Sequence, residues 1–175
     1  MVRKYLGTQL SPAEYYRAHA ADYDNPHADA VATVLDALVD RLHGVVVDIG
    51  CGDGLASKLL GPAGFACVGF DRDPTMIERY RAETGFPGWL GGFGDPIPQA
   101  DSAVASYALH LATPAELAVF WSNVRDAGVD TLVTISPFKH RPPAPAHFFE
   151  KTLAIAGNHG PAGKTVHGGV FVVRR

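Results

Sequence analysis

The fold of this chain is decided by residues 45–54, VVVDIGCGDG. An apolar run of strand type leads into glycines at 50, 52 and 54, and the segment Leu55–Leu60 that follows is typical of a helix. Gly50 and Gly52 permit a tight turn and let a ligand approach the backbone without a Cβ in the way. The first N–H groups of the helix would face the same ligand. The stretch therefore predicts a binding turn between a strand and a helix.

A carboxylate follows this turn at the end of the next apolar run, Ala66–Phe70. Asp71 stands 21 residues after Gly50. In a doubly wound sheet, the ends of neighbouring parallel strands meet at one edge, so Asp71 would lie beside the glycine turn. There it could accept hydrogen bonds from both hydroxyls of a ribose. The spacing therefore indicates a ligand that contains a ribose.

Strand signals alternate with helix signals along most of the chain. The strand signals are continuous apolar runs at residues 45–47, 66–70, 103–109 and 131–135. Such runs are typical of strands buried on both faces of a parallel sheet. A capping residue followed by proline marks helix starts at Ser11, Asn25, Asp73 and Thr113. The alternation predicts the α/β class, with N-terminal helices and a doubly wound, mostly parallel sheet.

The end of the chain departs from this alternation. Residues 148–155 and 166–173 are extended-looking runs, and the Gly- and Pro-rich stretch 157–163 joins them. We expect an antiparallel pair at the edge of the sheet, although residues 147–156 are equally compatible with a short helix.

Length and composition limit the kinds of protein that this chain can be. Its 175 residues, 47% hydrophobic and 19% charged, suffice for a single domain with a sizeable core, residues 1–175. The formal net charge of −3 disfavours nucleic acid as a partner. No apolar run approaches the roughly 20 residues of a membrane span, and residues 1–6 do not begin a signal peptide. Cys51 and Cys67 fall in expected core segments, which favours the reducing cytoplasm over a disulfide framework.

The motif Asp-x-Gly-x-Gly-x-Gly at residues 48–54, with Asp71 after the next strand, resembles the class I S-adenosylmethionine-dependent methyltransferases. Gly94-Asp95 is similar to that family's acidic turn after the third strand, and residues 106–111, SYALHL, are similar to the end of its fourth strand. The resemblance covers roughly residues 15–175. It implies a small single-domain enzyme with a Rossmann-like, seven-stranded methyltransferase sheet that closes with an antiparallel C-terminal hairpin.

The same resemblance implies S-adenosylmethionine as cofactor and assigns roles to residues of the turns. Asp48 would hold the amino end of the methionine moiety, Asp71 the ribose, and Asp95 the amino group of the adenine. The loop at residues 96–101 is shorter than the version usual in the family. The implied cofactor-binding residues are Asp48, Gly50, Cys51, Gly52, Asp71, Arg72, Gly94, Asp95 and Ser106.

The small size of the chain indicates where an acceptor would be chosen. With no inserted substrate domain, residues 1–43 form the expected N-terminal helical cap segment and residues 44–175 the cofactor-binding sheet. Selection of the acceptor would depend on the cap segment and on the loop at residues 136–147. We expect methyl transfer to oxygen or nitrogen of a small molecule. No required metal is expected, because the eight histidines lack metal-ligand spacing and there is no CxxC.

The candidate residues for catalysis and acceptor binding each have a plain structural alternative. His110, at the expected end of the fourth strand, is a candidate general base, or else a packing histidine beside the pocket. Tyr15 and Tyr16 are candidates to contact the substrate, or else they pack the N-terminal helix onto the domain. Lys139 and His140 belong to the densest basic cluster, which suits an anionic substrate group as well as a solvated loop.

Other functions fit parts of the sequence. An NAD-binding oxidoreductase would need glycine at position 55, where the chain has leucine. Nucleic-acid methylation is disfavoured because residues 106–109, SYAL, replace the Asn/Asp-Pro-Pro-Tyr/Phe signature of base methylation. A protein methyltransferase is a further alternative, and a tight turn that binds nothing would leave Asp48, Asp71 and Asp95 unexplained. A non-catalytic S-adenosylmethionine-binding module also stays open, and turnover is the observation that separates it from an enzyme.

Overall fold

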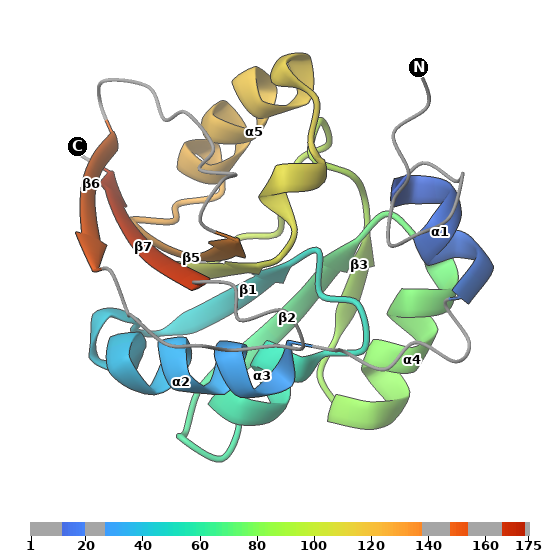
Figure 1. Cartoon of the computed structure of the whole chain (residues 1–175), viewed down its shortest axis with the longest axis horizontal. Helices are drawn as coiled ribbons and strands as arrows, with labels where there is room; N and C mark the ends of the chain where they lie inside the picture. The colour runs from blue at the N-terminus through green and yellow to red at the C-terminus, as the bar shows by residue number, and fades with distance from the viewer. Residues whose placement is uncertain (1–11, 20–26, 138–147, 154–165, 174–175) are drawn as a thin grey trace.

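The computed structural model describes residues 12–19, 27–137, 148–153 and 166–173, and a mixed sheet forms its centre (Figure 1). Over these residues the sheet has seven strands in the order β3-β2-β1-β4-β5-β7-β6. The parallel strands are β1 (Val45–Ile49), β2 (Ala66–Asp71), β3 (Gly88–Leu90), β4 (Ser102–Ser106) and β5 (Thr131–Pro137). β7 (Val166–Val173) runs antiparallel between β5 and β6 (Phe148–Leu153).

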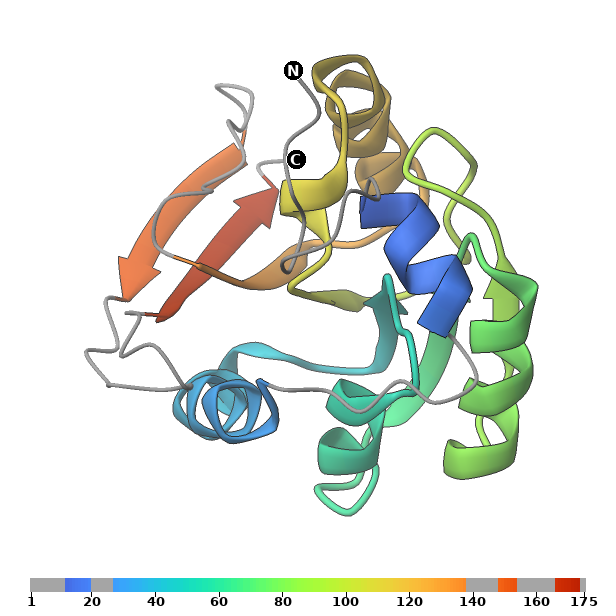
Figure 2. The same cartoon turned by 45° about the vertical axis from the view of Figure 1, so that its right-hand side comes forward.

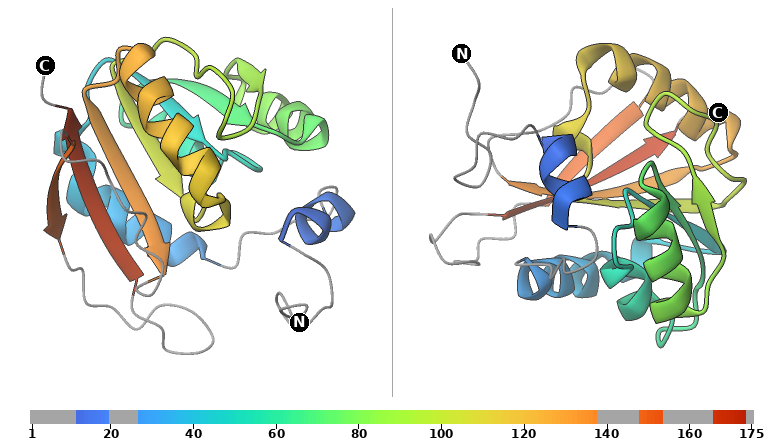
Figure 3. Two further views of the ribbon diagram at one scale, coloured as in Figure 1. Left: turned by 90° about the horizontal axis from the view of Figure 1, so that it is seen from above. Right: turned by 90° about the vertical axis from the view of Figure 1, so that its right-hand side faces the viewer.

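Helices cover both faces of this sheet, which confirms the doubly wound α/β fold. Figures 2 and 3 show helices packed on each face of the sheet. The first face carries α2 (Ala28–Leu38) with the short 3-10 turn η1 (Val39–Arg41), α3 (Leu55–Leu60) and α4 (Pro74–Thr84). The second face carries α5 (Pro114–Asp126).

The continuous apolar strands supply two cores because alternate residues of a strand face opposite layers. In β1, Val46 belongs to the buried cluster with α2, and Val47 belongs to the cluster with α5. Leu38 of α2 and Phe120 of α5 are fully buried in these clusters. Burial of each such side chain stabilises the fold by about 2 kcal/mol.

Two predicted helix starts are confirmed together with their caps. At the start of α4, the Asp73 side chain accepts a hydrogen bond from the Thr75 N–H at 2.9 Å. At the start of α5, Thr113 and Glu116 form a reciprocal capping box. Each cap satisfies N–H groups that the first helical turn leaves without a partner.

The other two predicted starts fare differently. The start predicted at Asn25 is wrong, because α2 begins at Ala28 with His27 as its N-cap and no side-chain cap bond. Asn25 itself lies outside the described residues. α1 (Pro12–His19) begins at the proline that follows Ser11, and Ser11 also lies outside the described residues.

The fourth predicted strand is shorter than its apolar run. β4 ends at Ser106, and the run continues into the 3-10 turn η2 (Leu109–Leu111). Tyr107 has a φ of +50°, a left-handed backbone conformation that breaks the strand. Ala108 and Leu109 are apolar for another reason, since both are buried in the cluster with α5.

The antiparallel pair at the end of the chain is confirmed. Residues 148–153 form a strand rather than a helix and pair with β7 along their length. The joining stretch 157–163 lies outside the described residues. β3 and β6 are the two edges of the described sheet.

The N-terminal helices take two different places. α2 shares a buried cluster with the sheet, whereas α1 lies at the side of the molecule where the parallel strands end (Figure 3). The division between a cap segment and a cofactor-binding sheet at residue 43 stays a prediction. Among the described residues, no helix is long and apolar enough to cross a membrane.

The strand order reverses at β1, and this reversal positions the site. The chain moves from β1 outward to β2 and β3, and then returns to the other side of β1 to form β4. At such a switch point the loops after neighbouring strands diverge, which leaves a crevice outside the carboxyl ends of the strands. The crevice here lies between the turn after β1 and the end of β4.

Candidate cofactor site

A cavity of about 190 Å³ lies at this switch point. Four segments line it: the glycine turn after β1, the end of β2 with the start of α4, the turn after β3, and the end of β4 with η2. Its wall therefore joins positions that are far apart in the sequence.

Two glycines shape the turn after β1 for different reasons. Gly50 has a φ of +66°, and a Cβ at this position would lie 2.5 Å from the Cβ of Ala108. Its N–H donates to the Phe70 carbonyl at 2.7 Å, which holds the turn against β2. Gly52 has a φ of +52° and lines the cavity, and no described atom lies within 4 Å of the place its Cβ would take. Position 50 needs glycine for close packing, whereas position 52 leaves space for a ligand.

Asp71 lies beside this turn and lines the cavity. The Gly52 N–H donates to its Oδ2 at 3.1 Å, and the Asp73 N–H donates to its Oδ1 at 2.9 Å. A carboxylate oxygen can accept two hydrogen bonds, so each oxygen keeps capacity for a ligand hydroxyl. Burial raises the pKa of Asp71, while the two N–H groups act to lower it.

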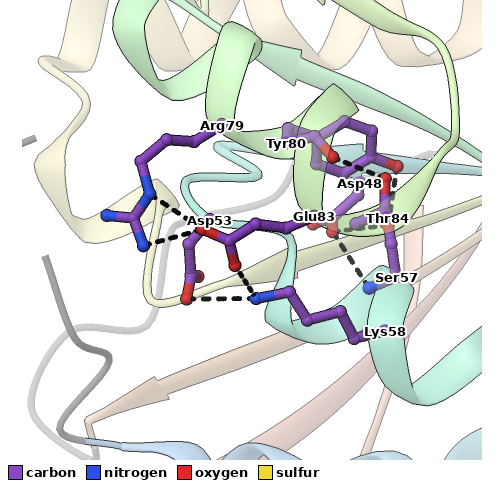
Figure 4. A network of polar contacts seen from close by, with 8 residues as sticks. All are labelled: Asp48, Asp53, Ser57, Lys58, Arg79, Tyr80, Glu83 and Thr84. Atoms are coloured by element: carbon purple, nitrogen blue, oxygen red, sulfur yellow. Dashed lines mark hydrogen bonds and ion pairs between the residues drawn. The ribbon is translucent and has the colours of Figure 1, made fainter. Parts of the chain in front are cut away.

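Asp48 in β1 is a buried carboxylate with one engaged oxygen. Its exposed fraction is 2%, and it also lines the cavity. Ser57 donates to Oδ2 from its N–H at 3.2 Å and from its hydroxyl at 2.8 Å (Figure 4). Among the described residues both hydrogen bonds fall on Oδ2, which leaves Oδ1 for a ligand. Burial raises the pKa of Asp48 to about 7, although the Ser57 hydrogen bonds act to lower it.

The end of β4 brings two hydroxyl-bearing residues, Ser106 and Tyr107, to the cavity wall. Ser106 lines the cavity, and its Oγ is buried without a hydrogen-bond partner among the described residues. Tyr107 follows and stacks on the imidazole ring of His27, with ring centroids 4.0 Å apart. Burial raises the pKa of Tyr107 to about 12. A buried hydroxyl without a partner is costly, so Ser106 points to a ligand that would complete its hydrogen bonding.

An ion-pair network joins the glycine turn to the two helices behind it (Figure 4). Lys58 of α3 lies 3.6 Å from Asp53 of the turn and also pairs with Glu83 of α4. Arg79 pairs with the same Glu83 at 2.9 Å. The hydrogen bond from Lys58 is the main reason that the pKa of Glu83 is lowered. Because Asp53 lines the cavity, the network supports one part of its wall.

Most of the cofactor residues expected from the sequence meet at this cavity. The ones that line it are Asp48, Gly50, Cys51, Gly52, Asp71, Arg72 and Ser106. Gly94 and Asp95 do not line it. The turn after β3 presents Gly91, Gly92 and Phe93 instead. The Asp95 carboxylate accepts a hydrogen bond from the Gly92 N–H at 2.8 Å within its own turn, and its role at an adenine stays a prediction.

The predicted catalytic and acceptor residues are not part of the described cavity wall. His110 lies on η2, and its ring meets the Tyr107 ring edge-on with centroids 6.4 Å apart. Tyr15 lies on α1 and stacks on His19 at 4.3 Å. The side chain of Tyr16 and the whole of Lys139 and His140 lie outside the described residues. In the described part of the chain, no group of three or more His, Cys, Asp or Glu side chains could hold a metal ion.

Sequence reasoning missed the apolar part of the wall. It includes Phe70, Met76, Phe93, Tyr107, Ala108 and Leu111. Phe93 and Tyr107 carried a usable signal, because both come shortly after a strand, at the edge where ligands bind. His27 carried none, since it stacks on Tyr107, which is 80 residues away in the sequence.

The strand order, the glycine turn and the carboxylate at the end of β2 together define the fold of the class I S-adenosylmethionine-dependent methyltransferases. The model of the family described as "Methyltransferase domain" matches residues 17–150. This match spans most of the chain, so the chain belongs to the methyltransferase domain family.

Individual relatives agree with this assignment. The chain is 30% identical over 105 residues to an uncharacterized methyltransferase from Synechocystis, which covers 55% of the chain and 48% of the relative. The chain thus spans about half the length of that curated relative. The methyltransferase domain of bacterial CtHen1 has the same fold, with a TM-score of 0.65 and 16% identity over 85% of this chain and 100% of that one. The magnesium protoporphyrin IX methyltransferase of Synechocystis, solved with bound S-adenosylmethionine, has a TM-score of 0.65 and 16% identity over 91% and 92%.

Proposed function

We propose that this chain binds S-adenosylmethionine in the cavity and transfers its methyl group to oxygen or nitrogen of a small molecule. The observation that carries the proposal is that Asp48 and Asp71 line one cavity together with the glycine turn. Asp71 has free acceptor capacity for two ribose hydroxyls, and Oδ1 of Asp48 suits an ammonium group. Membership of the methyltransferase domain family supports methyl transfer as the reaction.

The rest of the wall fits the same molecule. The space beside Gly52 admits ligand atoms that any side chain would displace. The Ser106 hydroxyl would gain the partner that the described residues do not give it. Phe93 and Met76 offer apolar surface that suits a flat heterocycle. Asp95, in the same turn as Phe93, is the proposed partner of the adenine amino group.

The chain's own part in the reaction is mainly alignment. When bound, S-adenosylmethionine supplies a methyl group that its sulfonium charge already activates. The two carboxylates hold the cofactor at its polar groups, and the Tyr107 ring closes the wall at the end of β4. A nucleophilic acceptor needs no base. For a hydroxyl acceptor, we propose that His110 acts as the general base. Its ring meets the Tyr107 ring edge-on.

We infer that the acceptor is chosen by residues 1–43 and 136–147. α1 lies at the side where the parallel strands end (Figure 3), so Tyr15 and Tyr16 are proposed to contact the acceptor. Lys139 and His140 are proposed to bind an anionic group on it. The net charge of −3 argues against nucleic acid as acceptor. The two cysteines are buried free thiols, which supports a cytoplasmic location.

Calorimetry with S-adenosylhomocysteine tests the binding site. Asp71→Ala removes the ribose acceptor and should weaken binding by about 30-fold, the usual cost of losing hydrogen bonds to a charged group. Asp101→Ala is the matched control. Its carboxylate accepts a hydrogen bond from the Val45 N–H at 2.7 Å, at the opposite end of β1, and its loss should leave affinity unchanged. Equal affinity in Asp71→Ala and the unmodified protein would refute the proposed site.

Turnover separates an enzyme from a binding module. Mass spectrometry of ligands carried through purification should reveal the cofactor or its demethylated product. A screen of metabolites as methyl acceptors should then yield S-adenosylhomocysteine with at least one of them. Tight cofactor binding without product from any acceptor would favour a non-catalytic module.

A further inference from the structure

We propose that Tyr80 is a positioning residue of the cofactor site, which acts through Ser57 on the Asp48 carboxylate and so sets the pH range of cofactor binding. The inference rests on the proposed function, because it takes Asp48 to hold the ammonium group of the cofactor. Tyr80 itself does not line the cavity.

Three buried groups form a continuous chain of hydrogen bonds (Figure 4). The Tyr80 hydroxyl lies 2.8 Å from Ser57 Oγ, and Ser57 Oγ lies 2.8 Å from Asp48 Oδ2. The three residues belong to α4, α3 and β1, and their exposed fractions are 0%, 0% and 2%. This hydrogen-bonded path therefore crosses the layer behind the glycine turn and meets solvent only at Asp48, in the cavity wall.

The direction of these hydrogen bonds follows from the chemistry of the acceptor. The Ser57 hydroxyl has one proton and donates it to the Asp48 carboxylate. Its oxygen can then only accept from Tyr80, so the phenol donates. Donation to an oxygen that is itself a donor polarises it and strengthens the next bond. The Tyr80 hydroxyl thus stabilises the ionised form of Asp48 through Ser57, without touching the carboxylate itself.

Packing alone explains the ring of Tyr80 but not its hydroxyl. A Cβ at Gly69 would lie 2.6 Å from the ring, and a Cβ at Gly54 would lie 3.0 Å from it. Both β2 and the glycine turn therefore close directly onto the ring. Phenylalanine would fill this space equally well and would avoid burying a polar group. The hydroxyl has a role of another kind, because it completes the hydrogen-bonded path through Ser57 to Asp48.

The surroundings of Asp48 make its charge sensitive to this chain. The negative charges of Asp71 and Asp53 act with burial to raise the pKa of Asp48 to about 7, and the Ser57 bonds oppose them. Lys58 lies 3.6 Å from Asp53. The side chains that face Asp48 from β2, the glycine turn, α3 and α4 are Cys67, Asp71, Cys51, Asp53, Ser57 and Tyr80. Small changes in hydrogen bonding therefore alter the fraction of ionised Asp48 near neutral pH.

Calorimetry from pH 5.5 to 8.5 with S-adenosylhomocysteine measures this effect. Affinity should fall as the pH drops, because protonated Asp48 no longer attracts the ammonium group. The pH at which half of this loss has occurred is the midpoint of the binding profile. Tyr80→Phe should move the midpoint upward by about half a pH unit, which makes binding about threefold weaker at pH 6 and leaves it unchanged at pH 8.5. 5′-Methylthioadenosine lacks the ammonium group, so its affinity should show no such shift.

Two further variants isolate the path through Ser57. Thr84→Val removes a hydroxyl on the same helix that bonds the Tyr80 carbonyl at 2.6 Å, and it should not move the midpoint. Ser57→Ala should move the midpoint further in the same direction, and adding Tyr80→Phe to it should have no additional effect. Ser57→Ala alone still tests the path at Ser57 if Tyr80→Phe folds poorly.

The outcomes distinguish this inference from the proposed function. Absence of S-adenosylhomocysteine binding at every pH would overturn the proposed function. Normal binding with the same midpoint in Tyr80→Phe and the unmodified protein would overturn the role of Tyr80 alone. A shift of equal size in Thr84→Val would reduce Tyr80 to a packing residue.

Discussion

The imidazole ring of His27 lies flat on the phenol ring of Tyr107, with centroids 4.0 Å apart and planes within 1° of parallel. His27 is the N-cap of α2, and Tyr107 is the residue that follows β4. The stack therefore links the N-terminal part of the chain to the cavity wall. The residue that presents its ring to this stack also has the left-handed backbone at φ +50°.

Loss of the His27 ring should loosen this link. We expect His27→Ala to lower the free energy of unfolding by about 1 kcal/mol, the usual value of an aromatic pair, and His27→Phe to restore most of it. Denaturant unfolding measures both. His43→Ala is a suitable control, because His43 is an exposed histidine paired with Asp130 at 2.8 Å. If His27→Phe is no better than His27→Ala, stacking is not what holds Tyr107.

The backbone of Tyr107 allows a separate test of strain. At a φ of +50°, alanine bears a steric penalty that glycine does not. Both substitutions remove the ring, so their difference reports the backbone alone. Tyr107→Gly should be more stable than Tyr107→Ala by about 1 kcal/mol in denaturant unfolding. The reverse order would show that residue 107 leaves the left-handed region once its ring is gone.

The buried Asp48 carboxylate should make stability depend on pH. Its pKa in the folded state, about 7, lies above the ordinary value of 3.8, so the folded state holds the proton more tightly. This contribution is complete below pH 3.8 and is lost as the pH rises through about 7. Asp48→Asn keeps an acceptor for Ser57 and removes the charge. It should therefore gain stability relative to the unmodified protein as the pH rises, by about 4 kcal/mol at pH 8, in thermal unfolding scans. A stability gain that is the same at pH 4.5 and pH 8 would contradict a raised pKa.

The two serines at the ends of β4 should respond in opposite ways. Ser106→Ala removes a buried hydroxyl without a partner among the described residues, so stability should rise by about 1 kcal/mol while S-adenosylhomocysteine affinity falls about fivefold. Ser102 accepts from the His43 N–H and donates to its carbonyl, both at 2.9 Å. Ser102→Ala should cost about 1 kcal/mol of stability and leave affinity unchanged. Calorimetry and denaturant unfolding on the same samples measure the affinity and the stability of the two variants. Equal losses of affinity in both would show that Ser106 is not part of the site.

The sequence predicted those parts of the site that local rules determine. The turn at 50–54 needs glycine for its backbone, and Asp71 follows from the length of one strand-helix-strand unit. The helix starts at Asp73 and Thr113 depend on neighbouring residues only, which is why both were confirmed. The fold class followed from the alternation of these local signals.

The rest depended on contacts between distant residues. The apolar run from 103 to 109 continues past the true end of β4, because Leu109 is buried in a turn rather than in a strand. Asp95 bonds its own turn, which no spacing indicates. Tyr80 and His27 reach the site through other residues, and their partners are fixed only when helices and strands pack together.

The position of β7 has a consequence for how this chain is made. In the described sheet, β6 is joined to the other strands only through β7, which follows it in the sequence. A ribosome that has extended the chain to Leu153 has produced β6 but not the strand that it pairs with. Pairing of β6 along its full length can therefore be complete only after synthesis has passed residue 173. A nascent chain halted earlier would carry an unpaired strand that chaperones or other chains can bind.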